Sequence, residues 1–175
     1  MRSTASDKRM TTFSRRAVLE WSGDVPRGSG RVLAESRAFA IAATFPRLAG
    51  EPAGATTPEE LLAASHATCF GIGLRSVLAQ HGGSAERIRV TATVTADKGR
   101  GAIRLRGAHL DAVVEGLSGV GPDALEGVAR AAEEACTIST VLRASIPITL
   151  DVRVGAIDVR AQEPSGPESD PKALA

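Results

Sequence analysis

The chain has 175 residues, enough for one domain of ordinary size or for one protomer of an intertwined oligomer. Its 21 Lys and Arg residues balance 20 Asp and Glu residues, and no basic stripe carries interleaved aromatic side chains, so nucleic acid is not an expected partner. The apolar stretches are interrupted well before membrane-spanning length, so no membrane association is expected.

The two cysteines favour a reducing compartment. Residues 14–19 faintly resemble a twin-arginine export signal, but the charged residues Glu20 and Asp24 follow where such a signal has an apolar run. Without an export signal we expect a cytoplasmic protein. Thiols such as Cys69 and Cys136 are then more often buried, metal-binding or redox-active than joined in a structural disulfide.

The composition along the chain predicts a single domain over residues 12–160, between a flexible polar arm over 1–11 and a disordered, proline-containing tail over 161–175. The domain is expected to begin with β structure. Strands are predicted over 13–21, 31–35 and 38–45, with a glycine turn at 28–30.

The clearest helix signal in the chain comes next. Thr57 suits the N-cap, Pro58 suits the first helical position, and Glu60 would complete a capping box. Glycine at position 82 predicts that the helix ends at residue 80 or 81. Apolar residues occur on all its faces, which is typical of a central, buried helix: Leu61, Leu62, Ala63, Ala64, Ala67, Phe70, Ile72, Leu74, Val77 and Leu78.

The second half alternates strands with helical spacing. Strands are expected over 87–96, 102–114 and 146–159, and a helix over 122–135. Cys136 is expected to open or interrupt a further helical turn before Leu142. The resulting fold class is α+β, with antiparallel strands around two principal helices that each carry one cysteine.

Four segments form a recognisable pattern, namely Trp21-Ser22-Gly23-Asp24 with Arg27-Gly28-Ser29-Gly30, Thr57-Pro58-Glu59-Glu60-Leu61, Ala64-Ser65-His66-Ala67-Thr68-Cys69-Phe70, and Ala135-Cys136 with Ser139 and Val141-Leu142. Together, over roughly residues 17–155, they resemble the OsmC/Ohr family of organic hydroperoxide reductases. Thr57 stands where the family commonly has asparagine, and Thr137 where it commonly has proline. The resemblance implies an OsmC-like fold, with antiparallel sheets wrapped around two central helices in an intertwined homodimer.

The resemblance also implies the roles of individual residues. Cys69 would be the peroxidatic cysteine and Cys136 the resolving cysteine. Glu59, ten residues before Cys69, matches the catalytic glutamate, and Arg47 is the best match to the catalytic arginine. The implied function is a thiol peroxidase that reduces fatty or aromatic hydroperoxides to alcohols in oxidative stress defence. It would pass through a Cys69 sulfenic acid and a Cys69–Cys136 disulfide, which a lipoylated protein would reopen. No cofactor is implied.

Elementary chemistry makes these roles reasonable. A thiol with a pKa of about 8.5 is mostly protonated at neutral pH and attacks only as the thiolate. Arg47 could stabilise that thiolate and the departing alkoxide, and Glu59 could hold the guanidinium by a bidentate pair. On a continuous helix, ten residues separate Glu59 from Cys69 by about 15 Å. The site is therefore expected to be shared between the two subunits of a homodimer.

Simpler interpretations remain open for each residue. Without the motif, both cysteines would be inert core residues, Glu59 a first-turn carboxylate favoured by the helix dipole, and Arg47 a surface arginine. At the level of function, the alternatives are a non-catalytic small-molecule binding module on the same fold, and a different thiol chemistry.

Two further patterns are weak. His66 and Cys69 lie three residues apart on one helical face, but zinc needs three or four ligands and the other histidines have no matching spacing. No metal site is therefore expected, and His66 is expected to pack in the core or to support the site from behind. Gly71 and Gly73 lack the rest of a dinucleotide-binding fingerprint and indicate close helix packing instead.

Overall fold

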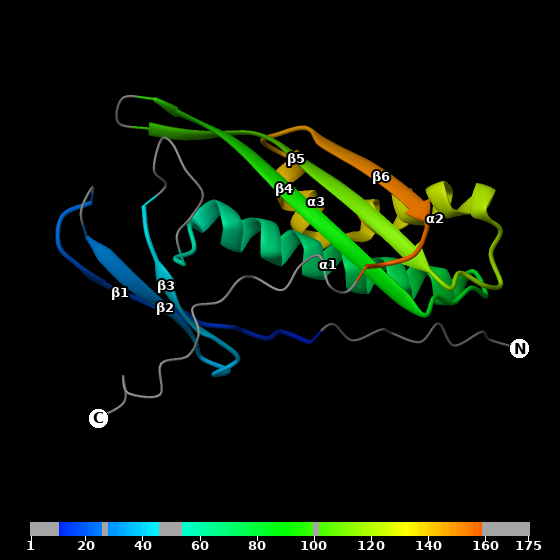
Figure 1. The fold of residues 1–175 in the computed structure, drawn as a ribbon, viewed down its shortest axis with the longest axis horizontal. Helices are drawn as coiled ribbons and strands as arrows, with labels where there is room; N and C mark the ends of the chain where they lie inside the picture. The colour runs from blue at the N-terminus through cyan, green and yellow to red at the C-terminus, as the bar shows by residue number, and fades with distance from the viewer. Residues whose placement is uncertain (1–10, 26–27, 46–53, 100–101, 159–175) are drawn as a thin grey trace, which may run out of the picture.

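The computed structural model describes residues 11–25, 28–45, 54–99 and 102–158 (Figure 1). Its elements are β1 (Ala17–Ser22), β2 (Ser29–Ala34), β3 (Ala40–Ala43), α1 (Pro58–Gln80), β4 (Arg87–Gly99), β5 (Ala102–Glu115), α2 (Pro122–Ala135), α3 (Thr137–Arg143) and β6 (Ile148–Val154). They form two three-stranded sheets, β1-β2-β3 and β4-β5-β6, which confirms the α+β class. The arm at 1–11 and the tail at 161–175 lie almost wholly outside the described residues, so these bounds and the domain bounds 12–160 stay predictions.

The N-terminal sheet is an antiparallel meander that stands beside the start of α1 (Figure 1). A side chain at Gly30 would meet Cε3 of Trp21 at 2.7 Å, so glycine allows the indole ring to lie across β2. A parallel bridge between Ala43 and Thr56 ties the sheet to the residues before α1. Among the described residues, this sheet has no extensive packing against the second sheet or the helices.

Helix α1 begins where the sequence predicts. Thr57 is the N-cap, with its Oγ1 accepting a 3.3 Å hydrogen bond from the N–H of Glu60, and Pro58 is the first helical residue. The carboxylate of Glu60 does not close the expected capping box; it accepts a 2.8 Å hydrogen bond from Oγ1 of Thr56. The helix ends before Gly82, whose φ of 72° lies in the left-handed region.

The main core lies between α1, α2 and the second sheet. Its largest buried side chains include Phe70, Leu74, Leu78, Leu110, Val114 and Leu125. Gly71 and Gly73 allow close packing there, because a Cβ at Gly71 would lie 3.3 Å from Val90 Cγ2 and one at Gly73 would lie 3.7 Å from the carbonyl oxygen of Ala132. This packing agrees with the structural interpretation of the two glycines.

The second sheet departs from the expectation in one respect. β4 and β5 form the expected long antiparallel hairpin, but β6 pairs parallel to β5. The reason is the connection: α2 and α3 carry the chain back along the sheet before β6 begins (Figure 1), and such a helical crossover returns the chain in the same direction. The expectation of antiparallel strands throughout was therefore wrong for this pair.

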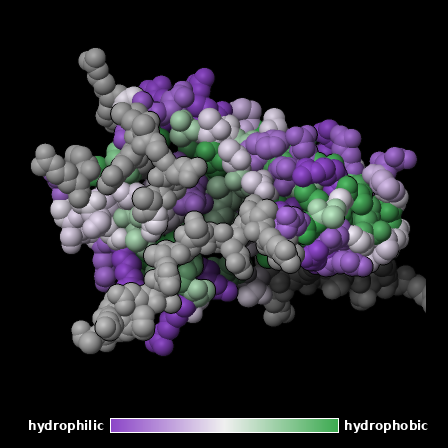
Figure 2. Space-filling model, in the orientation of Figure 1, coloured by the Kyte–Doolittle hydropathy of each residue, from purple (hydrophilic) through white to green (hydrophobic). Residues whose placement is uncertain are grey.

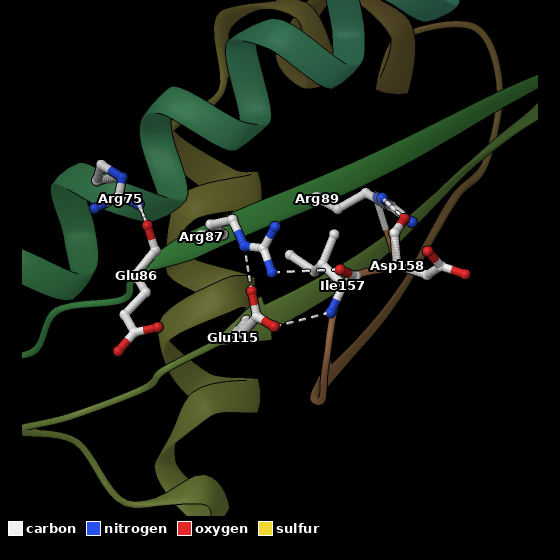
Figure 3. Close-up of polar contacts among 7 residues, drawn as sticks. All are labelled: Arg75, Glu86, Arg87, Arg89, Glu115, Ile157 and Asp158. Carbon is white, nitrogen blue, oxygen red and sulfur yellow. Dashed lines mark hydrogen bonds and ion pairs between the residues drawn. The ribbon is translucent and has the colours of Figure 1, made fainter. Parts of the chain in front are cut away.

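The residues that follow β6 are fixed across the outer face of β4 (Figure 3). Arg87 donates to the carboxylate of Glu115 and, at 3.4 Å, to the carbonyl oxygen of Ile157, whose own N–H donates to Glu115 at 3.2 Å. Arg89 donates to the carbonyl oxygen of Asp158. The hydrogen bond from Arg87 also holds the pKa of Glu115 below its usual value.

The described residues do not cover helix α1 fully. By length and composition it is apolar enough to cross a membrane, a test that core helices also pass, yet only 22% of its most apolar window is buried here. Ile72, near its centre, is 69% exposed. Apolar atoms gather in the recess between the N-terminal sheet and the main body, whereas the outer face of the second sheet is largely hydrophilic (Figure 2). Apolar surface of α1 therefore stays exposed among the described residues, which is typical of an interaction site.

Candidate active site

The structure brings the two cysteines together. Cys69 lies in the middle of α1 and is half-buried, whereas Cys136 is buried between α2 and α3. Their sulfur atoms are 3.1 Å apart, and both are free thiols. This distance fits a hydrogen bond from the Cys136 thiol to the Cys69 sulfur, and it is short enough for the pair to become a disulfide with little rearrangement.

The break between α2 and α3 determines where Cys136 points. Cys136 ends α2 and caps α3, with extended backbone angles of φ −70° and ψ 118°. Its sulfur takes the place of a capping oxygen and accepts a 3.5 Å hydrogen bond from the N–H of Ser139. The sequence prediction that Cys136 opens a further helical turn is confirmed.

The surroundings shift the two thiols in opposite directions. Burial raises the pKa of Cys69, but hydrogen bonds from the N–H of Ile138, the thiol of Cys136 and the N–H of Thr137 together bring it below its usual value. Burial is the largest influence on Cys136 and leaves its pKa above the usual value. Cys69 is therefore the thiol that ionises more readily, and the Cys136 thiol donates a hydrogen bond to its sulfur.

A buried polar pair lies behind the thiols. His66 and Ser139 are both fully buried, and Nε2 of His66 is 2.9 Å from Oγ of Ser139. Burial lowers the pKa of His66, although the nearby carboxylate of Glu133 acts in the opposite direction. His66 is therefore a neutral imidazole at neutral pH.

Glu59 lies in the first turn of α1 and has an unusual environment. Its Oε2 is buried and has no hydrogen-bond partner within the described part of the chain. A buried carboxylate oxygen without a donor is costly and calls for a cationic partner. Arg47, predicted to be that partner, falls among residues 46–53, outside the described residues. Because α1 is continuous, Glu59 and Cys69 of one chain are about 15 Å apart along the helix.

An apolar hollow opens between the N-terminal sheet and the first turn of α1. Its volume is about 320 Å³, within the usual range for a small-molecule site. It is lined by Leu19, Trp21, Val25, Val32, Ala43, Thr44, Phe45, Thr57, Pro58 and Leu61.

Metal ligation has no support in the described residues: no three His, Cys, Asp or Glu side chains there lie close enough to share an ion. His66, the candidate from the sequence, points to Ser139 instead.

Comparison with known proteins identifies the family. Residues 50–151, more than half of the chain, match the family model described as OsmC-like protein. The chain belongs to the OsmC family. It is 31% identical over 143 residues to peroxiredoxin OsmC of Escherichia coli strain K12, a match that covers 82% of this chain and 98% of the relative.

Solved structures agree with this assignment. A protein of Legionella pneumophila described as the organic hydroperoxide resistance protein OsmC is 26% identical, with a TM-score of 0.66, over 83% of this chain and all (100%) of the other. The fold is also that of an organic hydroperoxide resistance protein from Elizabethkingia anophelis, which is 23% identical with a TM-score of 0.67 over 84% of this chain and 100% of the other. The family and the similarity to a peroxiredoxin support a peroxide-related redox role and a peroxidase-like oxidoreductase at the level of the family.

Sequence reasoning missed part of the OsmC-family site. The N–H groups of Thr137 and Ile138, which lower the pKa of Cys69, were not anticipated, because any residue except proline has such a donor. The presence of a non-proline residue at position 137 was the one available signal.

Proposed function

We propose that this OsmC-family chain reduces organic hydroperoxides to alcohols by a two-thiol cycle, in the cytoplasm and in defence against oxidative stress. The observation that carries the proposal is the 3.1 Å approach of two sulfurs whose pKa values are shifted in opposite directions. A pair of structural core cysteines would not need this asymmetry. A cycle with one attacking and one resolving thiol requires it.

The cycle begins with the thiolate of Cys69. It attacks the terminal oxygen of the hydroperoxide, the O–O bond breaks, and the alkoxide leaves as an alcohol after taking up a proton, so that Cys69 becomes a sulfenic acid. The Cys136 sulfur then attacks the Cys69 sulfur, and water leaves as the disulfide forms. A dithiol reductant, for which we propose the dihydrolipoyl group of a lipoylated protein, restores both thiols.

The apolar hollow at the start of α1 supports an organic substrate. Trp21, Phe45 and Leu61 line it and would solvate an alkyl or aryl group, but offer little to hydrogen peroxide. Fatty or aromatic hydroperoxides are therefore the proposed substrate class.

A shared site in a homodimer would bring this hollow to a thiol pair. Glu59 and the hollow lie at the start of α1, about 15 Å along the helix from Cys69 of the same chain. The uncovered apolar surface of α1, including Ile72, favours a second copy of the chain packed against it. In such a dimer, Arg47 and Glu59 of one subunit would serve Cys69 and Cys136 of the other. The orphaned Oε2 of Glu59 fits a bond to the Arg47 guanidinium.

Thiol titration tests the proposed activity. The reduced protein is mixed with one equivalent of cumene hydroperoxide, and free thiols and cumyl alcohol are counted. Loss of two thiols per chain with one alcohol formed is the expected result. Unchanged thiols with retained binding of the hydroperoxide would instead favour a non-catalytic binding module on the same fold. Thiol loss without alcohol would indicate a different thiol chemistry.

Subunit mixing tests the shared site. Cys69→Ser and Arg47→Ala subunits, each inactive alone, are unfolded and refolded together. Random pairing makes half of the dimers mixed with one intact site each, so about one quarter of wild-type activity should return. Verified mixed dimers without activity would contradict a site shared between subunits.

A further inference from the structure

The two-thiol cycle leaves His66 unused, although its position is specific. It is fully buried one turn before Cys69 on α1, and its Nε2 lies 2.9 Å from Oγ of Ser139. Ser139 in turn contacts the resolving sulfur, because its N–H donates to Sγ of Cys136 at 3.5 Å, and its hydroxyl lies near enough to that sulfur to lower the pKa of Cys136 by a hydrogen bond. A continuous chain of contacts therefore runs from His66 through Ser139 to Cys136.

The other ring nitrogen decides the direction of these hydrogen bonds. Nδ1 of His66 is buried and has no partner among the described residues. A buried N–H without an acceptor costs more than a buried lone pair without a donor, so the neutral ring carries its proton on Nε2. Nε2–H then donates to Oγ of Ser139, and the serine hydroxyl hydrogen is left to point at the sulfur of Cys136.

We propose that His66 is a positioning residue for the resolving step, acting through Ser139 on Cys136. This inference rests on the proposed two-thiol cycle. In that step the Cys136 sulfur attacks the Cys69 sulfur, the S–O bond of the sulfenic acid breaks, and the hydroxide leaves as water with the proton from Cys136. The oriented serine hydroxyl stabilises the negative charge that Cys136 develops before the S–S bond forms. His66 does not contact the reacting sulfur and acts only by fixing the direction of that hydroxyl.

The surroundings of His66 keep its ring available for this task. Glu133, the carboxylate that faces it from α2, is itself paired with Arg143 of α3 at 2.5 Å. The pairing weakens the pull of Glu133 on a proton at His66. The ring therefore keeps the neutral form that the arrangement needs.

Rapid-quench single turnovers separate the two steps. Reduced protein is mixed with one equivalent of cumene hydroperoxide, and thiol, sulfenic acid and disulfide forms are counted by intact mass with a sulfenic acid trap. His66→Leu and Ser139→Ala should form the sulfenic acid at the wild-type rate, but close the disulfide about tenfold more slowly, the effect of losing one hydrogen bond to a developing charge. His66→Gln keeps an N–H donor at similar reach and should recover most of the lost rate.

A matched control is available on the second sheet. His109 makes a similar pair, with its Nδ1 2.8 Å from Oγ1 of Thr149, but it alternates with the buried residues Ala108 and Leu110 and so faces away from the helices. His109→Leu should change neither step.

The possible outcomes are distinct. Disulfide closure at the wild-type rate in both His66→Leu and Ser139→Ala would overturn the inference. So would an equal loss of both steps in Ser139→Ala, which would indicate a general structural role. Failure of the wild-type protein to form either a sulfenic acid or a disulfide would refute the two-thiol cycle itself, which is a different result.

Discussion

Replacing Thr137 by proline would test directly how the site activates Cys69. The N–H of Thr137 is one of the donors that lower the pKa of Cys69, and proline has no such donor. The fold should tolerate the change, because residue 137 is the first of α3, where proline is favoured. Cys136 already has φ −70° and ψ 118°, which suits a residue that precedes proline.

The expected effect can be estimated from the lost hydrogen bond. A bond to a charged acceptor stabilises the thiolate by about 1.5 kcal/mol, so losing it raises the pKa of Cys69. Below both pKa values the thiolate population then falls about tenfold, while the more basic thiolate is about threefold more nucleophilic. Peroxide reduction by Thr137→Pro should therefore be about threefold slower at low pH and about threefold faster at high pH, with a crossing between the two pKa values.

The assay combines thiolate absorbance with single-turnover rates across pH, both in a Cys136→Ser background that leaves one thiol. Thr137→Ala keeps the backbone donor and is the matched control. It should follow the parent protein at every pH. Equal pKa values for Cys69 in the Thr137→Pro and Thr137→Ala proteins would refute the assignment of the donor, and parallel rate profiles without a crossing would refute the nucleophilicity argument.

Three other outcomes are expected. Cys136→Ser should complete one turnover and accumulate a sulfenic acid that dimedone traps, whereas Cys69→Ser should lose even that turnover; the reverse pattern would mean that the roles are exchanged. Arg47→Lys should lose most activity at an unchanged melting temperature, because lysine keeps the charge but lacks the planar guanidinium that can hold Glu59 and the sulfur together. A fully active variant would exclude Arg47 from the mechanism. The kcat/KM for cumene hydroperoxide should exceed that for hydrogen peroxide by roughly two decades, because burying three or four methylene equivalents contributes about 0.8 kcal/mol each. Equal kcat/KM values for the two peroxides would contradict a role for the apolar pocket.

The sequence predicted those parts of the fold that depend on local chemistry. Thr57, Pro58 and Gly82 delimit α1 because caps act on the nearest turn. The direction of β6 was not predictable in the same way. The alternation of apolar and polar residues shows which face of a strand is buried, but not whether the strand pairs parallel or antiparallel to its neighbour. The bond from Thr56 to Glu60 was missed because a capping box pairs the Glu60 carboxylate with the backbone N–H of Thr57, whereas the position of the Thr56 hydroxyl depends on the bridge of Thr56 to Ala43, which is not a local signal.

The site was predictable to the extent that it depends on side-chain identity. Cys69 and Cys136 were found from the motif, and the structure brings their sulfurs together. The separation of Glu59 from Cys69 followed from helix geometry alone, and the continuous α1 confirms it. The link from His66 to Ser139 joins residues 73 positions apart, so only the packing of α3 against α1 reveals it.

The two cysteines also differ in how freely they can move when the disulfide forms. Cys69 is held inside a 23-residue helix, whereas Cys136 occupies a break before a helix of seven residues. Cys136 and α3 should therefore make the adjustment, giving up the weak 3.5 Å bond from Ser139. Once the disulfide has formed, the Cys69 sulfur no longer carries charge, so its hydrogen bonds from the N–H groups of Thr137 and Ile138 should weaken as well. Amide hydrogen exchange should accordingly become faster in residues 137–143 on oxidation and stay unchanged around Cys69. Faster exchange around Cys69 with an unchanged α3 would show that the long helix yields instead.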